Sequence, residues 1–177
     1  MSESYVKYRE AIHRGMCHDD AARLAKGVAS FVGPMRSNLT TMLDGIGLPE
    51  TLGLQSSTQL FSSHGQLLHA TSALRYPVFK NGLNYAGSPL PTKHTALREM
   101  IEDLLGPELA SFRNAIVVPL GKAVTTALDH LASIGQIDKS RCLIGFPHPS
   151  GANGHRAKQF EKNRADLSYQ VEKTLAI

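Results

Sequence analysis

The fold class is decided by a stretch near the carboxyl terminus, Ile144-Gly145-Phe146-Pro147-His148-Pro149-Ser150-Gly151-Ala152-Asn153-Gly154-His155-Arg156. An apolar run, Cys142 to Phe146, ends there in a polar loop, and a helical pattern follows at once. This order is typical of an open α/β sheet, which presents its site at the carboxyl ends of its strands. Two prolines fix the backbone on either side of His148, so we expect the loop to aim this histidine. The alternative is a Gly- and Pro-rich connection without further function.

Length and composition predict a single domain over residues 1–177. The chain has 177 residues, of which 42% are hydrophobic and 19% charged, enough for a core of its own. No apolar run is long enough to span a bilayer, and the first residues lack an apolar signal core. We therefore expect a cytoplasmic protein that does not associate with membranes. Neither Cys17 and Cys142 nor the histidines have metal-ligand spacing, so we expect no metal and no cofactor.

The charge balance is mildly basic, with a formal net charge of +4 and a pI of about 9.2. Such a balance is compatible with a polyanionic partner without requiring one. Basic side chains gather directly after the polar loop, at Arg156, Lys158, Lys162, Arg164 and Lys173. They are either a solvated helix face or a surface that steers phosphates.

Hydrophobic periodicity predicts helices that alternate with three short strands. Apolar residues at helical spacing indicate three helices in the first 45 residues and a later helix from Leu97 to Leu105 that ends at Gly106-Pro107. Two more helices are predicted around Leu128 and Leu167. The strands are expected at Gln66–Thr71, Asn114–Pro119 and Arg141–Phe146. Strands separated by helices pair in parallel, so we expect a three-layer α/β/α fold with a short, mainly parallel sheet.

The motifs in the second half of the chain occur in an order that can be compared with known families. An apolar strand leads into Val118-Pro119-Leu120-Gly121-Lys122-Ala123, and a helix and another strand lead to His148-Pro149-Ser150. This order resembles the carboxyl half of the uracil-DNA glycosylase superfamily. The single-strand-selective monofunctional branch has a second motif region with spacing similar to that of Leu68-His69-Ala70-Thr71-Ser72, Gly82-Leu83-Asn84 and Pro89-Leu90-Pro91. The resemblance covers roughly Gln66 to the end.

The resemblance implies a monofunctional DNA glycosylase of base excision repair. Such an enzyme hydrolyses the N-glycosylic bond of a flipped-out uracil or related damaged base. His148 would donate a hydrogen bond to the base carbonyl on which negative charge develops, and a neutral imidazole suffices for this. The enzyme would act as a monomer on single- or double-stranded DNA. The residues that would hold DNA phosphates are Ser150, Gly151, Asn153, His155, Arg156 and Lys122.

The chain departs from the superfamily pattern at two motifs. The family's first motif, a sheet strand that ends in Gly-x-x-Pro and carries the water-positioning residue, is not visible before Gln66. We therefore expect a uracil-DNA glycosylase-like domain whose first sheet strand is missing, either because it is incomplete at its amino terminus or because it is divergent. The position of the base-reading asparagine falls on Ala70, and Thr71, Ser72 or Asn84 could replace it. The base that is excised therefore stays open.

Two other functions fit the same sequence. The chain could be a catalytically impaired or inactive nucleic-acid-binding protein of the same fold, because the water-positioning motif is missing. It could also be an unrelated α/β domain in which the His-Pro-Ser loop is coincidental.

The long loop at 72–94 carries aromatic side chains, and a loop of this length in a compact domain is usually functional, so we expect it to bind a partner.

Overall fold

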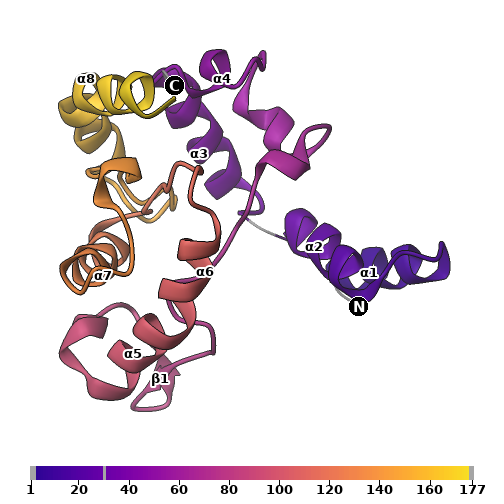
Figure 1. The fold of residues 1–177 in the computed structure, drawn as a ribbon, viewed down its shortest axis with the longest axis horizontal. Helices are drawn as coiled ribbons and strands as arrows, with labels where there is room; N and C mark the ends of the chain where they lie inside the picture. Colours follow the sequence, from indigo (N-terminus) through magenta and orange to yellow (C-terminus); the bar gives the residue numbers. More distant parts are fainter. Residues whose placement is uncertain (1–2, 30, 176–177) are drawn as a thin grey trace. The chain divides into compact units, whose positions relative to one another are not determined.

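The computed structural model describes residues 3–29 and 31–175 (Figure 1). The chain divides into two compact units. The amino-terminal unit comprises Met1–Ala70 with Pro149–Ala152, and the carboxyl-terminal unit comprises Thr71–His148 with Asn153–Ile177. Each unit is described by itself below. The assignment of one domain to residues 1–177 stays a prediction.

The amino-terminal unit is helical. The three helices predicted in this region are confirmed. Gly33, which has a φ of 68°, and Pro34 in the first helical turn separate the second helix from the third. Leu39, Met42 and Leu43 of the third helix are buried in the core of this unit. Its elements are α1 (Glu3–His13), α2 (His18–Ala29), α3 (Pro34–Gly45), α4 (Leu48–Thr51) and the 3₁₀ turns η1 (Ser57–Phe61) and η2 (Gly65–Leu67).

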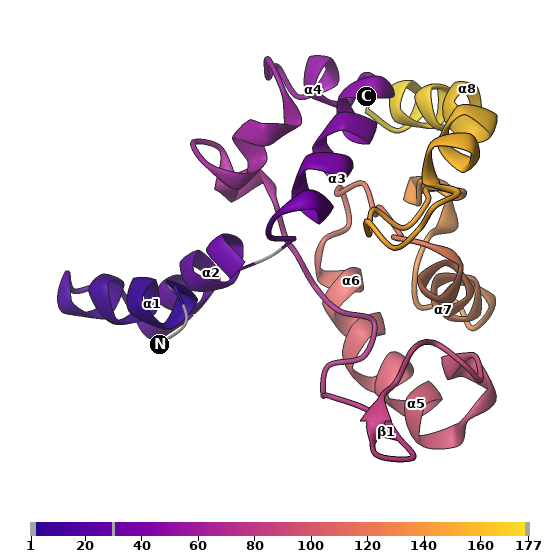
Figure 2. The ribbon, with the colours of Figure 1, turned by 180° about the vertical axis from the view of Figure 1, so that it is seen from behind.

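The carboxyl-terminal unit combines helices with one small hairpin. Leu128 and Leu131 pack in its core with Ile101, Leu105 and Cys142. In both views of the ribbon the hairpin lies beside α5 (Figure 1, Figure 2). The elements are β1 (Phe79–Lys80), β2 (Leu83–Asn84), η3 (Pro91–Lys93), α5 (Thr95–Met100), η4 (Ile101–Leu105), α6 (Gly106–Ser111), α7 (Lys122–Ser133), η5 (Lys139–Arg141) and α8 (Arg156–Leu175).

The prediction of a three-layer α/β/α fold with a mainly parallel sheet is wrong. Helices account for 57% of the structure. The described residues form one sheet, in which β1 and β2 pair antiparallel. The apolar runs that predicted parallel strands are present, but they do not assemble into a layer that helices could cover on two faces.

Local backbone geometry limits the pairing of the two predicted strands at 114–119 and 141–146. They meet in a single parallel bridge, in which Val117 N–H donates to Arg141 O and Leu143 N–H donates to Val117 O, both at 2.9 Å. Pro119 has no N–H with which to continue the ladder. On the other run, Ile144 N–H turns back to Cys142 O at 2.8 Å, and Gly145 has a φ of 97°. The pairing therefore ends after one bridge.

The strand predicted at Gln66–Thr71 does not form. Its first two residues belong to the 3₁₀ turn η2, and Leu68 N–H donates to Gly65 O at 3.2 Å. The residues that follow adopt no regular structure. A short apolar run does not specify a strand by itself, because a ladder also needs a partner strand with free backbone groups.

The helix predicted to end at Gly106-Pro107 continues through both residues. Between α5 and α6 the chain makes the π turn η4, and Pro107 lies in the first turn of α6, where a missing N–H is tolerated. Gly106 suits a crowded position, because an added Cβ would lie 1.8 Å from Gln136 Oε1 and 3.2 Å from Leu131 Cδ2. This glycine therefore serves close packing.

The end of α6 is held by Arg141, which is only 7% exposed. Its guanidinium donates to Leu109 O at 2.7 Å, to Ala115 O at 3.2 Å and to Phe112 O. The last carbonyls of a helix have no intrahelical donors and attract a cation. Arg141 therefore binds the carboxyl end of α6 and the residues that follow to the segment that leads into the His148 loop.

The final helix agrees with its predicted pattern. Phe160, Leu167 and Val171 are buried along one face of α8. Leu175, which was predicted to lie on the same face, is outside the residues whose side chains the structure describes. None of the helices in the described ranges combines the length and the apolar character that a membrane span requires.

Candidate functional site

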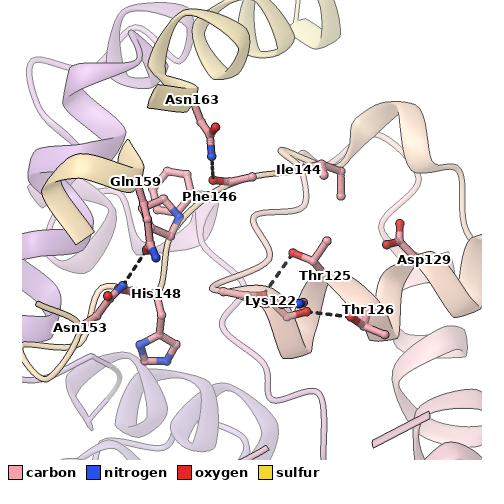
Figure 3. Close-up of a pocket in the computed structure, with 13 residues that line it drawn as sticks. Lys122, Thr125, Thr126, Asp129, Ile144, Phe146, His148, Asn153, Gln159 and Asn163 are labelled. Atoms are coloured by element: carbon pink, nitrogen blue, oxygen red, sulfur yellow. Dashed lines mark hydrogen bonds between the residues drawn. The ribbon is translucent and has the colours of Figure 1, made fainter. Parts of the chain in front are cut away.

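A pocket of about 480 Å³ lies beside His148 in the carboxyl-terminal unit. Figure 3 shows side chains from the start of α7 on one side, and those of His148, Asn153 and the first turns of α8 on the other. The volume is in the range of small-molecule sites. The residues that line it are Gly121, Lys122, Thr125, Thr126, Asp129, Ile144, Gly145, Phe146, Pro147, His148, Asn153, Gln159 and Asn163.

The backbone that leads to His148 is held by packing and hydrogen bonds. Phe146 is 1% exposed, and its ring meets that of Phe160 edge to face at 6.4 Å. Asn163 Nδ2 donates to Gly145 O at 2.8 Å (Figure 3), and Asn153 Nδ2 donates to His148 O at 3.1 Å. A side chain on a backbone fixed in this way loses little freedom when it meets a ligand.

The start of α7 approaches His148 closely. Gly121 has a φ of 90°, and its N–H donates to Phe146 O at 3.2 Å. A Cβ added at Gly121 would lie 3.0 Å from the Cβ of His148. Glycine therefore serves two purposes at this position, the left-handed backbone and the close approach.

We predict that Gly121→Ala both strains the backbone and displaces His148. With a φ of 90° and a ψ of 171°, Gly121 has a backbone conformation that is nearly restricted to glycine and that costs alanine about 1–3 kcal/mol, which urea denaturation would measure as a lower free energy of unfolding. The control is Gly135→Ala, because Gly135 has a φ of 76° with no atom within 4 Å of the added Cβ. Both variants should lose stability, Gly121→Ala the more, but only Gly121→Ala should shift the NMR signals of the His148 ring. Equal His148 shifts in the two variants would contradict the contact.

The pKa of His148 is lowered from the ordinary value of 6.5 by burial. His148 is an exposed residue, but the protein atoms around its ring remove part of its hydration and so disfavour the imidazolium. At neutral pH His148 is therefore a neutral imidazole, with one N–H to donate and one nitrogen to accept.

The lowered pKa predicts the direction of a titration. In NMR spectra the His148 ring should titrate below pH 6.5, and His148→Gln identifies its signal by removing it. The folded protein binds this proton more weakly than the unfolded chain does. The free energy of unfolding contributed by His148 should thus fall as the pH drops below about 6.5 and through the folded-state pKa. A midpoint above 6.5 would contradict partial burial of the ring.

Asn153 connects the His148 loop to the beginning of α8. Besides its bond to His148 O, its Nδ2 donates to Gln159 Oε1 at 3.1 Å, and its Oδ1 accepts from His155 N at 3.3 Å. His155 is exposed and Arg156 is the first residue of α8. The phosphate contacts expected of these three residues stay predictions, and the observed role of Asn153 is to hold the loop.

Ser150 and Gly151 belong to the amino-terminal unit. Ser150 Oγ accepts from Ala152 N at 3.2 Å, and the neighbouring Pro149 O accepts from Asn38 Nδ2 at 2.9 Å. The predicted phosphate contacts of Ser150 and Gly151 are not tested by these bonds. Lys122, by contrast, lies on the pocket beside His148 and begins α7.

The three residues proposed to read the base do not line the pocket. Thr71 Oγ1 donates to Glu108 Oε2 at 2.8 Å, and Arg75 Nη2 reaches the same oxygen at 2.6 Å. Ser72 is exposed, and Asn84 lies in β2. Thr71 and Arg75 therefore anchor the start of the long loop to α6.

Polar residues of α7 and α8 that sequence reasoning missed complete the lining. Gln159 and Asn163 are four residues apart, as are Thr125 and Asp129, and residues with this spacing share a helix face. This periodicity of polar side chains was available in the sequence. Asp129 Oδ1 also forms an ion pair with Lys139 Nζ at 2.6 Å. Within the described part of the chain no three His, Cys, Asp or Glu side chains gather to hold a metal ion.

Comparison with known proteins shows one clear similarity. The chain is 37% identical over 186 aligned residues to the uncharacterized protein YoxB of Bacillus subtilis (strain 168). The alignment covers 100% of this chain and 70% of that protein. No protein-family model matches the chain, and no solved structure matches it.

Proposed function

The chain belongs to the family of the Bacillus subtilis protein YoxB, and we propose that it is a monofunctional DNA glycosylase related to the uracil-DNA glycosylase superfamily. It would release a flipped-out uracil or a related damaged base from DNA. The observation that supports this proposal most is the position of His148, a neutral imidazole that its backbone holds at the edge of a pocket of about 480 Å³. The corrected fold class leaves this local chemistry unchanged.

The proposed reaction needs only water as a co-reactant. The bond between C1′ of the deoxyribose and the ring nitrogen of the base breaks, and its electron pair leaves with the base. An N–H of His148 stabilises the negative charge on the base carbonyl. Water adds its oxygen to C1′, and one of its protons finally resides on the released base. The products are a free base and an abasic site.

The charge distribution around the pocket supports a polyanionic substrate. Within the carboxyl-terminal unit, residues 139–148 and 153–160, which supply part of the lining, contain no Asp or Glu, and Asp129 of the lining is paired with Lys139. Lys122 contributes a cation at the first residue of α7, where the free N–H groups of a helix start favour phosphate. This arrangement fits a DNA backbone that passes the pocket while one nucleotide is turned inward.

A second function is favoured by the state of Asp129. Among the pocket-lining residues it supplies a carboxylate, but that carboxylate is paired with Lys139. A site without a free carboxylate to orient water would bind an extruded nucleotide without releasing its base. The alternative is therefore a nucleic-acid-binding protein without glycosylase activity.

Base release distinguishes the two functions. The chain is incubated with end-labelled oligonucleotides, single- and double-stranded, that carry one uracil or one other damaged base, and alkali then cleaves any abasic site. We expect strand breaks at the damaged base that appear only after alkali, as a monofunctional enzyme requires, and none at thymine. Binding without alkali-sensitive breaks would favour the second function, and the absence of both would contradict each of them.

The proposal carries further expectations about setting and assembly. A protein that repairs DNA would reside in the cytoplasm with access to the nucleoid. It would act as a monomer, because one pocket handles one extruded nucleotide. It would use neither metal nor cofactor, since the leaving base is stabilised by His148 and the attacking group is water.

A further inference from the structure

We propose that the β1–β2 hairpin binds single-stranded DNA through Phe79 and Asn84, next to the nucleotide held in the pocket. This inference rests on the proposed function, because it names the form of DNA that the same site receives. It is carried by the geometry of the hairpin, by its charge and by its connection to α7.

The hairpin presents an aromatic ring and an amide on one face. Phe79 pairs with Asn84, and Lys80 pairs with Leu83, so side chains of each pair share a face. Asn81 and Gly82 both have positive φ values, as expected for the tight turn that Asn-Gly forms. Phe79 is 64% exposed, and Asn84 is exposed beside it.

The opposite face of the hairpin contacts the rest of its own loop. Tyr85 N–H donates to Val78 O at 2.9 Å, which extends the pairing by one step. Tyr85 is partly buried, its hydroxyl donates to Pro89 O, and burial raises its pKa. Lys80 Nζ donates to Ser88 O at 3.2 Å, while Leu83 on the same face is 73% exposed. The loop therefore holds the hairpin through Tyr85 and Lys80, and the side chains of Phe79 and Asn84 are exposed.

The charge of this segment selects a polyanion as the partner. Over the 28 residues from 71 to 98, which belong to the carboxyl-terminal unit, the sequence has no carboxylate side chain and four cations. Arg75 and Arg98 form ion pairs with Glu108 and Glu102, while Lys80 donates to Ser88 O and Lys93 is exposed. An aromatic ring in a cationic setting is the usual platform for unpaired bases, which stack on it irrespective of sequence. The amide of Asn84 can both donate to and accept from a base edge. Paired bases do not offer their faces in this way.

The chain that leaves the hairpin runs to the rim of the pocket. Gly87 lies three positions after Asn84, a span of at most about 10 Å. A Cβ added at Gly87 would lie 3.6 Å from the Cβ of Ala123 in α7, and the neighbouring Lys122 lines the pocket. A strand with one nucleotide in the pocket therefore has its neighbouring bases within reach of Phe79.

Binding of a short single-stranded oligonucleotide without any damaged base tests the inference independently of catalysis. Fluorescence anisotropy at low salt would compare the full chain with Phe79→Ala and Asn84→Ala. We expect Phe79→Ala to raise the Kd by roughly 5- to 100-fold, the effect of one lost base stack, and Asn84→Ala to raise it less. The matched control is Tyr169→Ala, since Tyr169 in α8 is also 64% exposed.

The outcomes separate this inference from the proposed function. The hairpin is supported as a surface for single-stranded DNA if Phe79→Ala loses more affinity for the single strand than Tyr169→Ala does, and loses less affinity for duplex DNA. This holds even if no base is released. Equal losses for the two variants, or equal losses on duplex, overturn it even if base release occurs. The inference would also be overturned if light scattering showed that Phe79→Ala changes the molar mass of the protein in solution while its DNA affinity stays the same. Phe79 would then contact a second copy of the chain.

Discussion

We expect His148→Ala to reduce the rate of the proposed base release by about 10²- to 10³-fold, the usual cost of removing one donor aimed at developing negative charge. The expectation follows from its position, because the imidazole is neutral and lies on the pocket beside Lys122. Single-turnover release of uracil from an oligonucleotide measures the effect. DNA affinity should change little, since the donor acts when charge develops on the base and not when DNA first binds.

The control for this variant is another exposed histidine. His94→Ala removes an imidazole that precedes α5 and makes no side-chain cap. It should leave base release within about twofold, the scale of surface substitutions that perturb neither a cap nor a core contact. His148→Gln tests the donor itself, because an amide N–H can partly replace that of an imidazole. Full activity of His148→Ala would sink the assignment of this residue as the group that stabilises the leaving base.

Arg141→Ala should lower the free energy of unfolding by about 3 kcal/mol or more. Hydrogen bonds from a charged donor each contribute about 1.5–3 kcal/mol, and this variant removes the donor to Leu109 O, Phe112 O and Ala115 O together. Leu109 O and Phe112 O would each keep one backbone donor, from Phe112 N and Ala115 N, but would lose the charged one. Urea denaturation followed by circular dichroism measures the loss.

Arg113→Ala is the matched control for the Arg141 variant. Arg113 lies in the same connection after α6 but is exposed. Its removal should change the free energy of unfolding by about 0.5 kcal/mol or less. Arg141→Lys should fall between the two, because lysine keeps the charge but not the planar fork that reaches several carbonyls. Similar stabilities for Arg141→Ala and Arg113→Ala would show that the guanidinium does not hold the end of α6.

Helices were predictable because their pattern is local. Leu128 and Leu131 recur at helical spacing and are buried in α7, and Phe160 and Leu167 behave in the same way in α8. That the predicted parallel sheet does not form could not be foreseen from local patterns in the sequence. Its runs are apolar, but pairing depends on Pro119 and on the turn at Ile144 and Gly145, which act between segments far apart in the sequence. Hydrophobic periodicity indicates which residues are buried, but it does not indicate whether the backbone hydrogen-bonding groups of two strands can pair.

The candidate site divides in a similar way. The position of His148 could be inferred from the loop between two prolines, and Lys122 from the junction that begins a helix. The spacing of Gln159 and Asn163 was visible in the sequence, but the bond of Asn163 to Gly145 O was not, because it depends on how α8 packs against Phe146. The buried role of Arg141 was hidden for the same reason, since a charged residue before an apolar run is usually exposed.

The π turn η4 sets the rotation of α6 about its axis. A π turn is in effect one extra residue within a helix, and each residue of an α-helix turns the chain by about 100°. One further residue inserted between Ile101 and Leu105 would therefore turn Glu108 by about 100° away from Thr71 and Arg75, both of which bind its Oε2, whereas deletion of one residue would restore ordinary α-helical turns and keep Glu108 on the same face. The number of residues in this turn thus fixes where the long loop that carries Phe79 and Asn84 begins its course, and a single-codon insertion there would alter the loop without touching it.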